Sequence, residues 1–276
     1  MSGLLILCST PIGNLADVSE RLRESLAAAD TIYAEDTRRS AKLLKHLGVS
    51  TPLRSYFVGN EANRQEELGS RLAAGETIAL VTDAGTPGIS DPGYTAVRAA
   101  LAAGARITVI PGPSAATAAL VASGLPSDRF VFEGFLPRRG AARSERIAGL
   151  GSERRTIVLF TSKTRLVADL EDLSQALDAD RRCAVARELT KINEELWRGT
   201  LGEAVGHWGS AEPKGEFTLV IEGAPAPAAD LTAAVAESLK RVSEGSTTAD
   251  AVRGVATERG VSRRELYEAV IEERPT

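Results

Sequence analysis

The sequence predicts an α/β protein of two domains followed by a small helical appendage. The chain has 276 residues, and a domain usually contains about 100–200 residues. Short apolar runs alternate with amphipathic stretches in the first half, and the apolar runs lie closer together in the second half. A Pro/Ala-rich segment then precedes a purely helical pattern. We therefore place the domains at 1–121 and 122–225, and the linker with its helical tail at 226–276.

Composition excludes several classes of protein. Apolar residues make up 43% and charged residues 25% of the chain, as in soluble globular proteins. The net charge of −4 does not suit a purely electrostatic nucleic-acid binder, although a bulk count permits a local basic patch. Two cysteines and two histidines, none of them clustered, exclude a zinc site and a disulfide framework. We expect no metal.

The N-terminus begins with a strand-like apolar run that enters a turn almost at once. It lacks the basic region of a signal peptide. No apolar run reaches the roughly 18–20 residues that span a bilayer. We expect a cytoplasmic protein with no membrane partner.

The first half alternates strands and helices, which indicates a largely parallel sheet covered on both faces. We expect strands at 4–8, 31–35, 77–83 and 106–112, and helices after Asp17, through 41–47, at 63–75, at 94–103 and from Ser114. Asp17 is the expected N-cap of the first helix, with Glu20 as its capping-box partner. Val18, Leu22 and Leu26 have the spacing of one helical face.

The second half indicates a mixed α+β domain. We expect strands at 129–135, 155–162, 182–190, 194–201 and 216–223, and helices at 142–150, 163–177 and 201–208. The tail predicts three helices, at 231–243, 248–258 and 262–273. The last two are joined by a short turn, in the manner of a helix-turn-helix. A dimerisation or docking bundle fits the tail equally well.

Gly/Pro-rich loops at 10–14, 84–93 and 111–114 follow three strands of the first half. Ligands of parallel sheets bind at such strand ends. Neither common phosphate-binding glycine motif is present. Backbone groups, small side chains, Asp83 and Asp91 suit a nucleoside-like ligand with a cationic group. The plain alternative is a set of connecting loops, but 84–93 is long for that purpose.

Two charged segments stand out. EDTR at 35–38 ends the second strand, where its side chains could act at the site or cap the next helix. Six arginines crowd 138–155, a stretch with only two acids. That density is typical of a phosphate-contacting loop, although a solvated face is equally compatible.

Several motifs together resemble the rRNA-modifying branch of the tetrapyrrole methylase superfamily. They are, in chain order, STPIGNLADVS, AEDTR, DAGTPGISDPG, PGPSAATAALVASGLPSDRFVFEGFLPR, ARELTKINEE, RGT and KGEFTLVI. The resemblance covers almost the whole chain and includes the tail.

The resemblance implies a two-domain tetrapyrrole-methylase-like fold, usually a homodimer, with S-adenosylmethionine held between the domains. It implies 2′-O-methylation of a cytidine in the decoding region of 16S rRNA, within the small ribosomal subunit or its late precursor. DNA is not an expected partner. The alternatives are a tetrapyrrole C-methyltransferase and a non-catalytic RNA-binding assembly factor.

The resemblance also assigns residues to the cofactor. The matched positions are Pro11, Gly13, Asp83, Ala84, Gly85, Thr86, Ile89, Ser114, Ala115, Thr161 and Leu189. Leu189 stands where other members have glycine, so we expect a backbone contact there at best. Arg139 stands where relatives often have lysine, which keeps the charge.

Catalytic and RNA-contacting residues are expected around the same rim. Glu35 and Asp36 are candidates for a general base, and Lys191 and Arg38 could stabilise a developing alkoxide. The expected phosphate contacts are Arg138, Arg139 and Arg143 in the basic stretch, and Arg263 and Arg264 at the start of the last helix.

Overall fold

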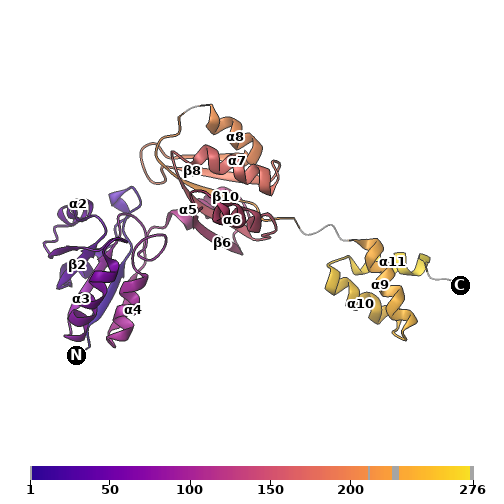
Figure 1. Ribbon diagram of the computed structural model, residues 1–276, viewed down its shortest axis with the longest axis horizontal. Coiled ribbons are helices and arrows are strands. Elements are labelled where there is room, and N and C mark those ends of the chain that lie inside the picture. The colour runs from indigo at the N-terminus through magenta and orange to yellow at the C-terminus, as the bar shows by residue number, and fades with distance from the viewer. Residues whose placement is uncertain (1, 211, 226–229, 274–276) are drawn as a thin grey trace. The chain divides into compact units, whose positions relative to one another are not determined.

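The computed structural model describes residues 2–210, 212–225 and 230–273 (Figure 1). The chain divides into two compact units, 1–224 and 225–276. Part of the expected linker, 226–229, lies outside the described residues. Among the described helices, none is both long and apolar enough to cross a membrane.

The first sheet of the larger unit is entirely parallel, as expected. Its strands are β1 (Leu4–Cys8), β2 (Thr31–Ala34), β3 (Leu53–Ser55), β4 (Thr77–Val81) and β5 (Arg106–Ile110). They lie in the order β3-β2-β4-β1-β5. The sequence does not predict the short edge strand β3, because its residues, LRS, carry no apolar run.

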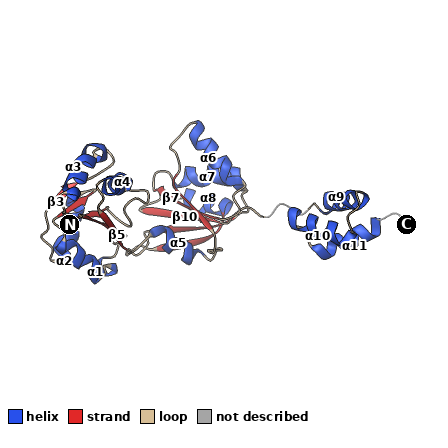
Figure 2. Ribbon diagram, turned by 90° about the horizontal axis from the view of Figure 1, so that it is seen from below, coloured by secondary structure: helices blue, strands red, loops and turns tan. Residues whose placement is uncertain are grey.

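Helices cover both faces of this sheet (Figure 2). They are α1 (Glu20–Ala28), α2 (Thr37–Leu47), α3 (Glu61–Ala73) and α4 (Tyr94–Ala102). Leu22, Leu26 and Leu44 of α1 and α2 pack on one face. Leu68 and Leu72 of α3 pack with the alanines of α4 on the other. Because the strands are parallel, they all end at the same edge of the sheet, where their loops gather.

The predicted cap at Asp17 is wrong. Asp17 ends a short 3₁₀ turn, Leu15–Asp17, which is capped by Asn14. Ser19 caps α1 instead, because its hydroxyl accepts a hydrogen bond from the amide of Leu22. Both Asp and Ser are good caps, so the residue type alone could not choose between them.

The second sheet is mixed. Its strands are β6 (Phe130–Phe135), β7 (Thr156–Ser162), β8 (Arg182–Arg187), β9 (Glu195–Thr200) and β10 (Glu216–Ile221), in the order β6-β7-β10-β8-β9. Only the β6/β7 pair is parallel within it. The helices are α5 (Ala115–Ser123), α6 (Ala141–Gly151), α7 (Leu166–Leu177) and α8 (Leu201–Gly209). Figure 2 shows α5 on one face of this sheet and the other three on the opposite face.

The position of α5 bears on the expected domain boundary. Ala116, Ala119 and Leu120 of α5 pack against Val158 and Val220 of the second sheet. A boundary between 121 and 122 would cut this helix and separate it from the sheet that it covers. The polypeptide passes to the second sheet before α5 rather than after it.

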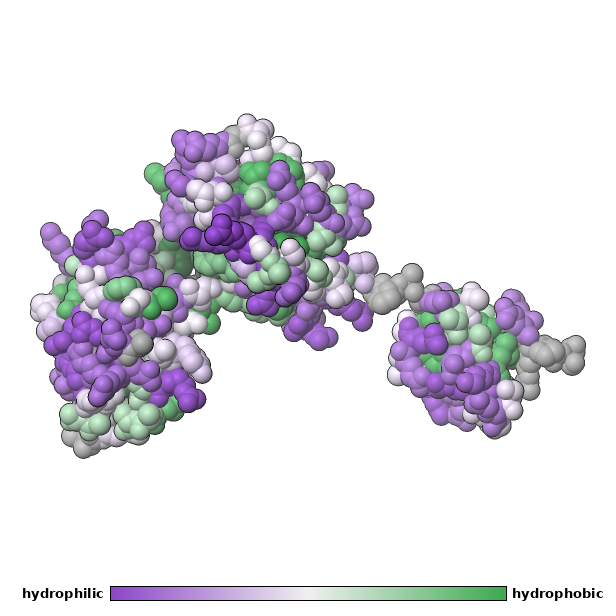
Figure 3. Space-filling model, in the orientation of Figure 1, coloured by the Kyte–Doolittle hydropathy of each residue, from purple (hydrophilic) through white to green (hydrophobic). Residues whose placement is uncertain are grey.

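The smaller unit contains α9 (Leu231–Ser243), α10 (Thr248–Arg259) and α11 (Arg263–Glu273), which match the three expected helices. It has a core of its own, which includes Val235, Val252 and Leu266. Gly260 ends α10 in the left-handed conformation, with φ of 66°. Hydrophilic residues cover much of the visible surface of both units (Figure 3).

The two cysteines are distributed one to each sheet of the larger unit. Cys8 lies on β1 and Cys183 on β8, and both side chains are buried. Burial raises the pKa of each thiol to about 12, so both remain protonated. Such thiols are small apolar core residues and poor nucleophiles.

Arg143 is part of a buried ion-pair network, which argues against its expected contact with RNA. It is only 8% exposed. Its guanidinium pairs with Asp169 at 2.8 Å and Asp172 at 2.7 Å, and also donates to the carbonyl oxygen of Pro137. Arg165 also pairs with Asp169, at 3.2 Å. The charge of Arg143 therefore holds α6 to α7 inside the protein and is not presented to a ligand.

Replacing Arg143 with methionine tests this structural role. Methionine keeps much of the aliphatic volume but leaves the buried Asp169 with one cation fewer. Breaking one side of a buried pair costs about 3–5 kcal/mol, and because Arg165 remains we expect a loss near 3 kcal/mol in urea unfolding. Arg139→Met, at an exposed position, is the matched control and should change stability by less than about 0.5 kcal/mol. Equal urea midpoints for the two variants would contradict the assignment.

Candidate functional site

A cavity of about 450 Å³ lies at the carboxyl ends of the first sheet's strands and beside the second sheet. Its size falls within the range of about 300–1,000 Å³ typical of small-molecule sites. Eleven of the predicted site residues line it: Glu35, Asp83, Ala84, Gly85, Thr86, Ile89, Ser114, Ala115, Thr161, Leu189 and Lys191. Segments from both halves of the unit 1–224 therefore contribute to one cavity.

Two of the cavity loops are joined by backbone hydrogen bonds. The amide of Thr10 donates to Gly85 at 2.9 Å, and the amide of Gly85 donates back to Thr10 at 3.1 Å. The hydroxyls of Ser9 and Thr86 lie 2.9 Å apart. Gly85 has φ of 83°, a backbone conformation that residues with a Cβ atom rarely adopt. These contacts fix the loop after β4 against the loop after β1.

Gly13 allows a close approach between the two halves of the unit. A Cβ atom at this position would lie 2.4 Å from Cγ of Lys191 and 3.0 Å from the carbonyl oxygen of Leu189. Neither Gly13 nor Pro11 is among the residues that line the cavity. Gly13 instead sets the distance between the loop 10–14, called the first loop below, and the segment 189–191. Ile12 of that loop and Leu189 and Lys191 of that segment line the cavity.

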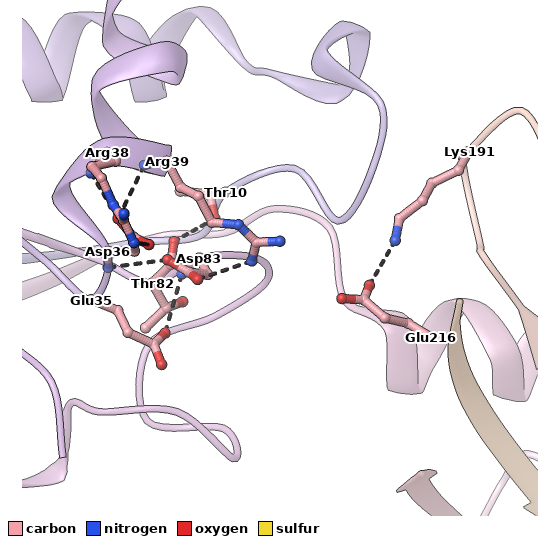
Figure 4. Close-up of polar contacts among 9 residues, drawn as sticks. All are labelled: Thr10, Glu35, Asp36, Arg38, Arg39, Thr82, Asp83, Lys191 and Glu216. Carbon is pink, nitrogen blue, oxygen red and sulfur yellow. Dashed lines mark hydrogen bonds and ion pairs between the residues drawn. The ribbon is translucent and has the colours of Figure 1, made fainter. Parts of the chain in front are cut away.

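Charged groups on the first sheet's side form one connected cluster (Figure 4). Arg39 pairs with Asp83 at 2.9 Å. The other oxygen of Asp83 accepts the amide of Asp36 at 3.1 Å, and the amide of Asp83 donates to Glu35 at 3.3 Å. Burial raises the pKa of Glu35, and the amide of Asp83 partly opposes that shift.

Asp36 and Arg38 occupy structural positions outside the cavity lining. Asp36 is the N-cap of α2 and accepts the amides of Arg38 and Arg39. The Arg38 side chain, 90% exposed, pairs back onto Asp36 at 3.3 Å, and this hydrogen bond holds the pKa of Asp36 low. The helix-capping alternative considered for EDTR therefore accounts for both residues.

Arg39 borders the cavity, although the sequence does not single it out. Successive residues of a helix point about 100° apart, so either Arg38 or Arg39 could have faced the site. Sequence reasoning assigned no role to several other lining residues. Five of them lie within the quoted motifs, namely Ile12, Ser90, Phe135, Glu216 and Phe217, and two lie outside them, Phe160 and Lys163. Asp91, noted above with its loop, also lines the cavity.

Lys191 lies on the wall formed by the second half of the chain. Its ammonium pairs with Glu216 at 2.7 Å and Glu188 at 2.9 Å, and Figure 4 shows it across from the Asp83 cluster. Burial lowers the pKa of Lys191, but the two carboxylates together outweigh burial and raise it. Lys191 therefore stays a cation, which excludes it as a general base at neutral pH.

The segment that carries Lys191 is held in an unusual backbone conformation. Glu188 has φ of 51° and Thr190 has φ of 66°, values that residues other than glycine rarely adopt. The amide of Thr190 donates to Glu194, and the carboxylate of Glu188 accepts the amide of Glu216 at 2.9 Å. Strained residues of this kind concentrate at functional sites.

The expected RNA contacts fall into two places. Arg138 and Arg139 are exposed in the loop after β6, whose last residue, Phe135, lines the cavity. Arg263 and Arg264 are exposed at the start of α11, in the smaller unit. Arg264 pairs with Glu268 at 3.0 Å across two exposed side chains, a contact worth little energy.

The described residues contain no group of three or more His, Cys, Asp or Glu side chains that could hold a metal ion. The cavity fits an organic ligand better. Its apolar wall includes Phe160 and Ile89, its loops offer backbone groups, and its carboxylates suit a cation. An adenosine group joined to an amino acid and a sulfonium centre has this combination of properties.

Solved structures of methyltransferases share the fold. A uroporphyrin-III C-methyltransferase from Thermus thermophilus, complexed with S-adenyl homocysteine, is 16% identical with a TM-score of 0.56, over 80% of this chain and 97% of that one. Diphthine synthase is 18% identical with a TM-score of 0.62, over 80% and 90%. Residues 4–205 match the family described as Tetrapyrrole (Corrin/Porphyrin) Methylases. The fold and site thus define a methyltransferase class.

Curated relatives narrow this class. Proteins named Ribosomal RNA small subunit methyltransferase I are 46% identical in Synechocystis sp., over 98% of both chains, and 40% identical in Escherichia coli O157:H7, over 98% of this chain and 96% of the relative. The relative in Mycobacterium tuberculosis is 47% identical, over 99% and 96%. The chain belongs to the tetrapyrrole methylases and, within them, to the family of ribosomal RNA small subunit methyltransferase I.

A Gly13→Ala substitution tests the close approach described above. The added Cβ should push the 189–191 segment away from the first loop and so enlarge the cavity. We expect affinity for S-adenosylhomocysteine, measured by calorimetry, to fall by about tenfold or more, equivalent to about 1.4 kcal/mol. Gly149→Ala, on α6 with open space around it, is the matched control and should bind normally. Unchanged affinity in Gly13→Ala would show that the spacing of these loops is not critical.

Proposed function

We propose that this protein transfers a methyl group from S-adenosylmethionine to the ribose 2′-hydroxyl of a cytidine in 16S rRNA, within the small ribosomal subunit or its late precursor. The observation that carries the proposal is the 40–47% identity, over nearly the full chain, to relatives that bear the rRNA methyltransferase name. The cavity described above supports it, because its size and chemistry suit the methyl donor. We further propose that the enzyme works in the cytoplasm as a homodimer.

The cavity residues can promote methyl transfer mainly by positioning. The bound donor supplies a methyl group already activated by its sulfonium charge. The protein must then hold the ribose oxygen in line with that methyl group, and alignment alone can contribute about 7–11 kcal/mol. Lys191, which remains protonated, can stabilise negative charge that develops on the oxygen. We propose this role for Lys191 and a role near the reacting hydroxyl for Glu35.

The RNA backbone should approach over the loop that carries Arg138 and Arg139. These arginines follow β6. The parallel strand β7 beside it ends at Ser162, and Thr161, Ser162 and the next residue, Lys163, line the cavity. A nucleotide that enters the cavity would therefore place its neighbouring phosphates near this basic loop. Because a 2′-hydroxyl is absent from DNA, the proposed reaction is selective for RNA.

The smaller unit has less positive charge for RNA than its arginines alone suggest. Residues 230–273 contain six basic and nine acidic side chains. Arg241 and Arg253 are paired with carboxylates. Arg264 is also paired, but both side chains of that pair are exposed, so a phosphate could replace Glu268 at little cost. We propose that RNA contact in this unit is confined to the start of α11, at Arg263 and Arg264. The alternative is that the same helices mediate dimerisation or docking. Deletion of residues 226–276 distinguishes the two roles. Weaker binding to small ribosomal subunits, with the dimer retained, supports RNA contact.

The decisive experiment measures the substrate directly. Protein incubated with tritiated S-adenosylmethionine should label small ribosomal subunits and should leave uroporphyrinogen unlabelled. Alkaline hydrolysis should then leave a resistant dinucleotide, because a methylated 2′-hydroxyl cannot attack its phosphate. Label in uroporphyrinogen alone would favour the tetrapyrrole C-methyltransferase, and label in neither would favour a non-catalytic assembly factor.

The basic loop gives a second measurable expectation. The double variant Arg138→Ala/Arg139→Ala should weaken binding to small subunits and reduce the slope of log affinity against log salt by about 0.7–0.9 for each phosphate that the loop no longer neutralises. The control Arg98→Ala/Arg106→Ala removes equal charge at positions outside the cavity lining. A salt titration in which both variants superimpose on the parent protein would exclude the loop from RNA binding.

A further inference from the structure

Asp91 is a cavity carboxylate that the sequence analysis relates only to a ligand's positive charge, and neither the motifs nor the relatives assign it a catalytic role. It lies in the loop between β4 and α4, and it borders the same cavity as Glu35 and Asp83. Within the described residues it forms no ion pair, whereas Asp83 is paired with Arg39. A fourth carboxylate of the cavity, Glu216, is paired with Lys191. Glu35, Asp83 and Asp91 differ in how many protein groups already bind each of them.

The hydrogen-bonding capacity of Asp83 and Glu35 is partly used. Asp83 accepts the amide of Asp36 through one oxygen and binds Arg39 through the other. Glu35 accepts the amide of Asp83. Both oxygens of Asp83 are thus already engaged by protein donors, and Asp91 is the least engaged of the three.

The surroundings of Asp91 strengthen it as a base. Burial, followed by the negative charge of Glu35, raises the pKa of Asp91 to about 7, and the hydroxyl of Thr82 opposes this only in part. A general base is most effective when its pKa lies near the working pH. The other charged side chains of the cavity are Arg39, Lys163, Lys191 and Glu216. Arg39 and Lys191 are each paired with a carboxylate other than Asp91.

The loop around Asp91 is fixed in place. Ser90 has φ of 62°, and the amide of Gly88 donates to Pro92 at 3.1 Å. A Cβ atom on Gly93 would lie 2.7 Å from the amide nitrogen of Gly88. Glu61 of α3 accepts the amide of Gly93 at 3.1 Å. The backbone on both sides of Asp91 is therefore held by specific contacts, which is the requirement for a group that must meet a substrate atom.

We propose that the Asp91 carboxylate accepts the proton of the substrate's ribose 2′-hydroxyl during methyl transfer, while Glu35 tunes it. The proposal rests on the proposed function. In the step, the O–H electrons of the hydroxyl become available to form the new O–CH₃ bond, and the C–S bond electrons remain on sulfur as the thioether product. The proton resides on Asp91 and passes to water when the products leave. Lys191 faces the reaction from the opposite wall.

A first test needs neither substrate nor cofactor. Because the folded-state pKa of about 7 exceeds the ordinary value of 3.8, the folded protein favours protonated Asp91, and this stabilisation is lost as pH rises through 7. Asp91→Asn should therefore raise the melting temperature relative to the parent at about pH 8 but not at about pH 4. Asp128→Asn, at an exposed position, is the matched control and should show no such pH-dependent difference. Identical melting behaviour of both variants would show that the pKa of Asp91 is not raised in the folded protein.

A second test measures single-turnover methyl transfer to small subunits across pH. The parent rate should rise with pH around 7, and Asp91→Asn should lower the rate by about 10²–10⁴-fold and remove that rise. Glu35→Gln should retain the rise but shift it to lower pH, because a negative charge near Asp91 is removed. Calorimetry should show unchanged affinity for S-adenosylhomocysteine in Asp91→Asn.

Two results would overturn the assignment. A pH-dependent rise that persists in Asp91→Asn would place the proton elsewhere. Loss of affinity for S-adenosylhomocysteine in that variant, with the rise retained, would make Asp91 a cofactor-binding residue. Failure of the parent protein to methylate small subunits would instead refute the proposed function, and the melting experiment would still report on Asp91.

Discussion

The site depends on the close contact between the first loop and the 189–191 segment. Gly13 lies against backbone and side-chain atoms of that segment, with no room for a Cβ. The left-handed residues Glu188 and Thr190 turn the chain so that Lys191 reaches the cavity wall. One hydrogen at Gly13, in place of a methyl group, thus determines how near the two sheets' loops come. Hydrogen bonds with Glu194 and Glu216 support the backbone conformation of 188–190.

Periodicity and turn residues predict most of the fold, because long apolar runs and glycine stops leave few alternatives. All the predicted strands and helices are present, with ends shifted by a few residues. The three-residue strand β3 escapes prediction since it is polar and short. The boundary at 121/122 is misplaced because α5 is apolar on all sides, so its sequence does not reveal which sheet it covers. The short turn predicted between the last two tail helices is present, and Gly260 ends α10 there.

The candidate site is predictable at the level of loops and less so at the level of side chains. Glycine and proline mark where a loop must bend, and those positions lie around the cavity. Charge alone does not distinguish a residue that faces a ligand from one that faces its own protein. Arg143 pairs internally and Arg38 folds back on its helix cap, whereas Arg39, the next residue, borders the cavity. Only the three-dimensional partners of each group decide among these roles.

The cysteines provide an internal reporter of how the larger unit opens. Each sheet contains one buried thiol, Cys8 in the first and Cys183 in the second. An alkylating reagent can modify such a thiol only when the surrounding strands separate, so its labelling rate measures local opening. The two sites can be distinguished by mass spectrometry after digestion. The unmodified enzyme thus allows the flexibility of its two sheets to be compared, with and without bound ligand, and no probe has to be introduced.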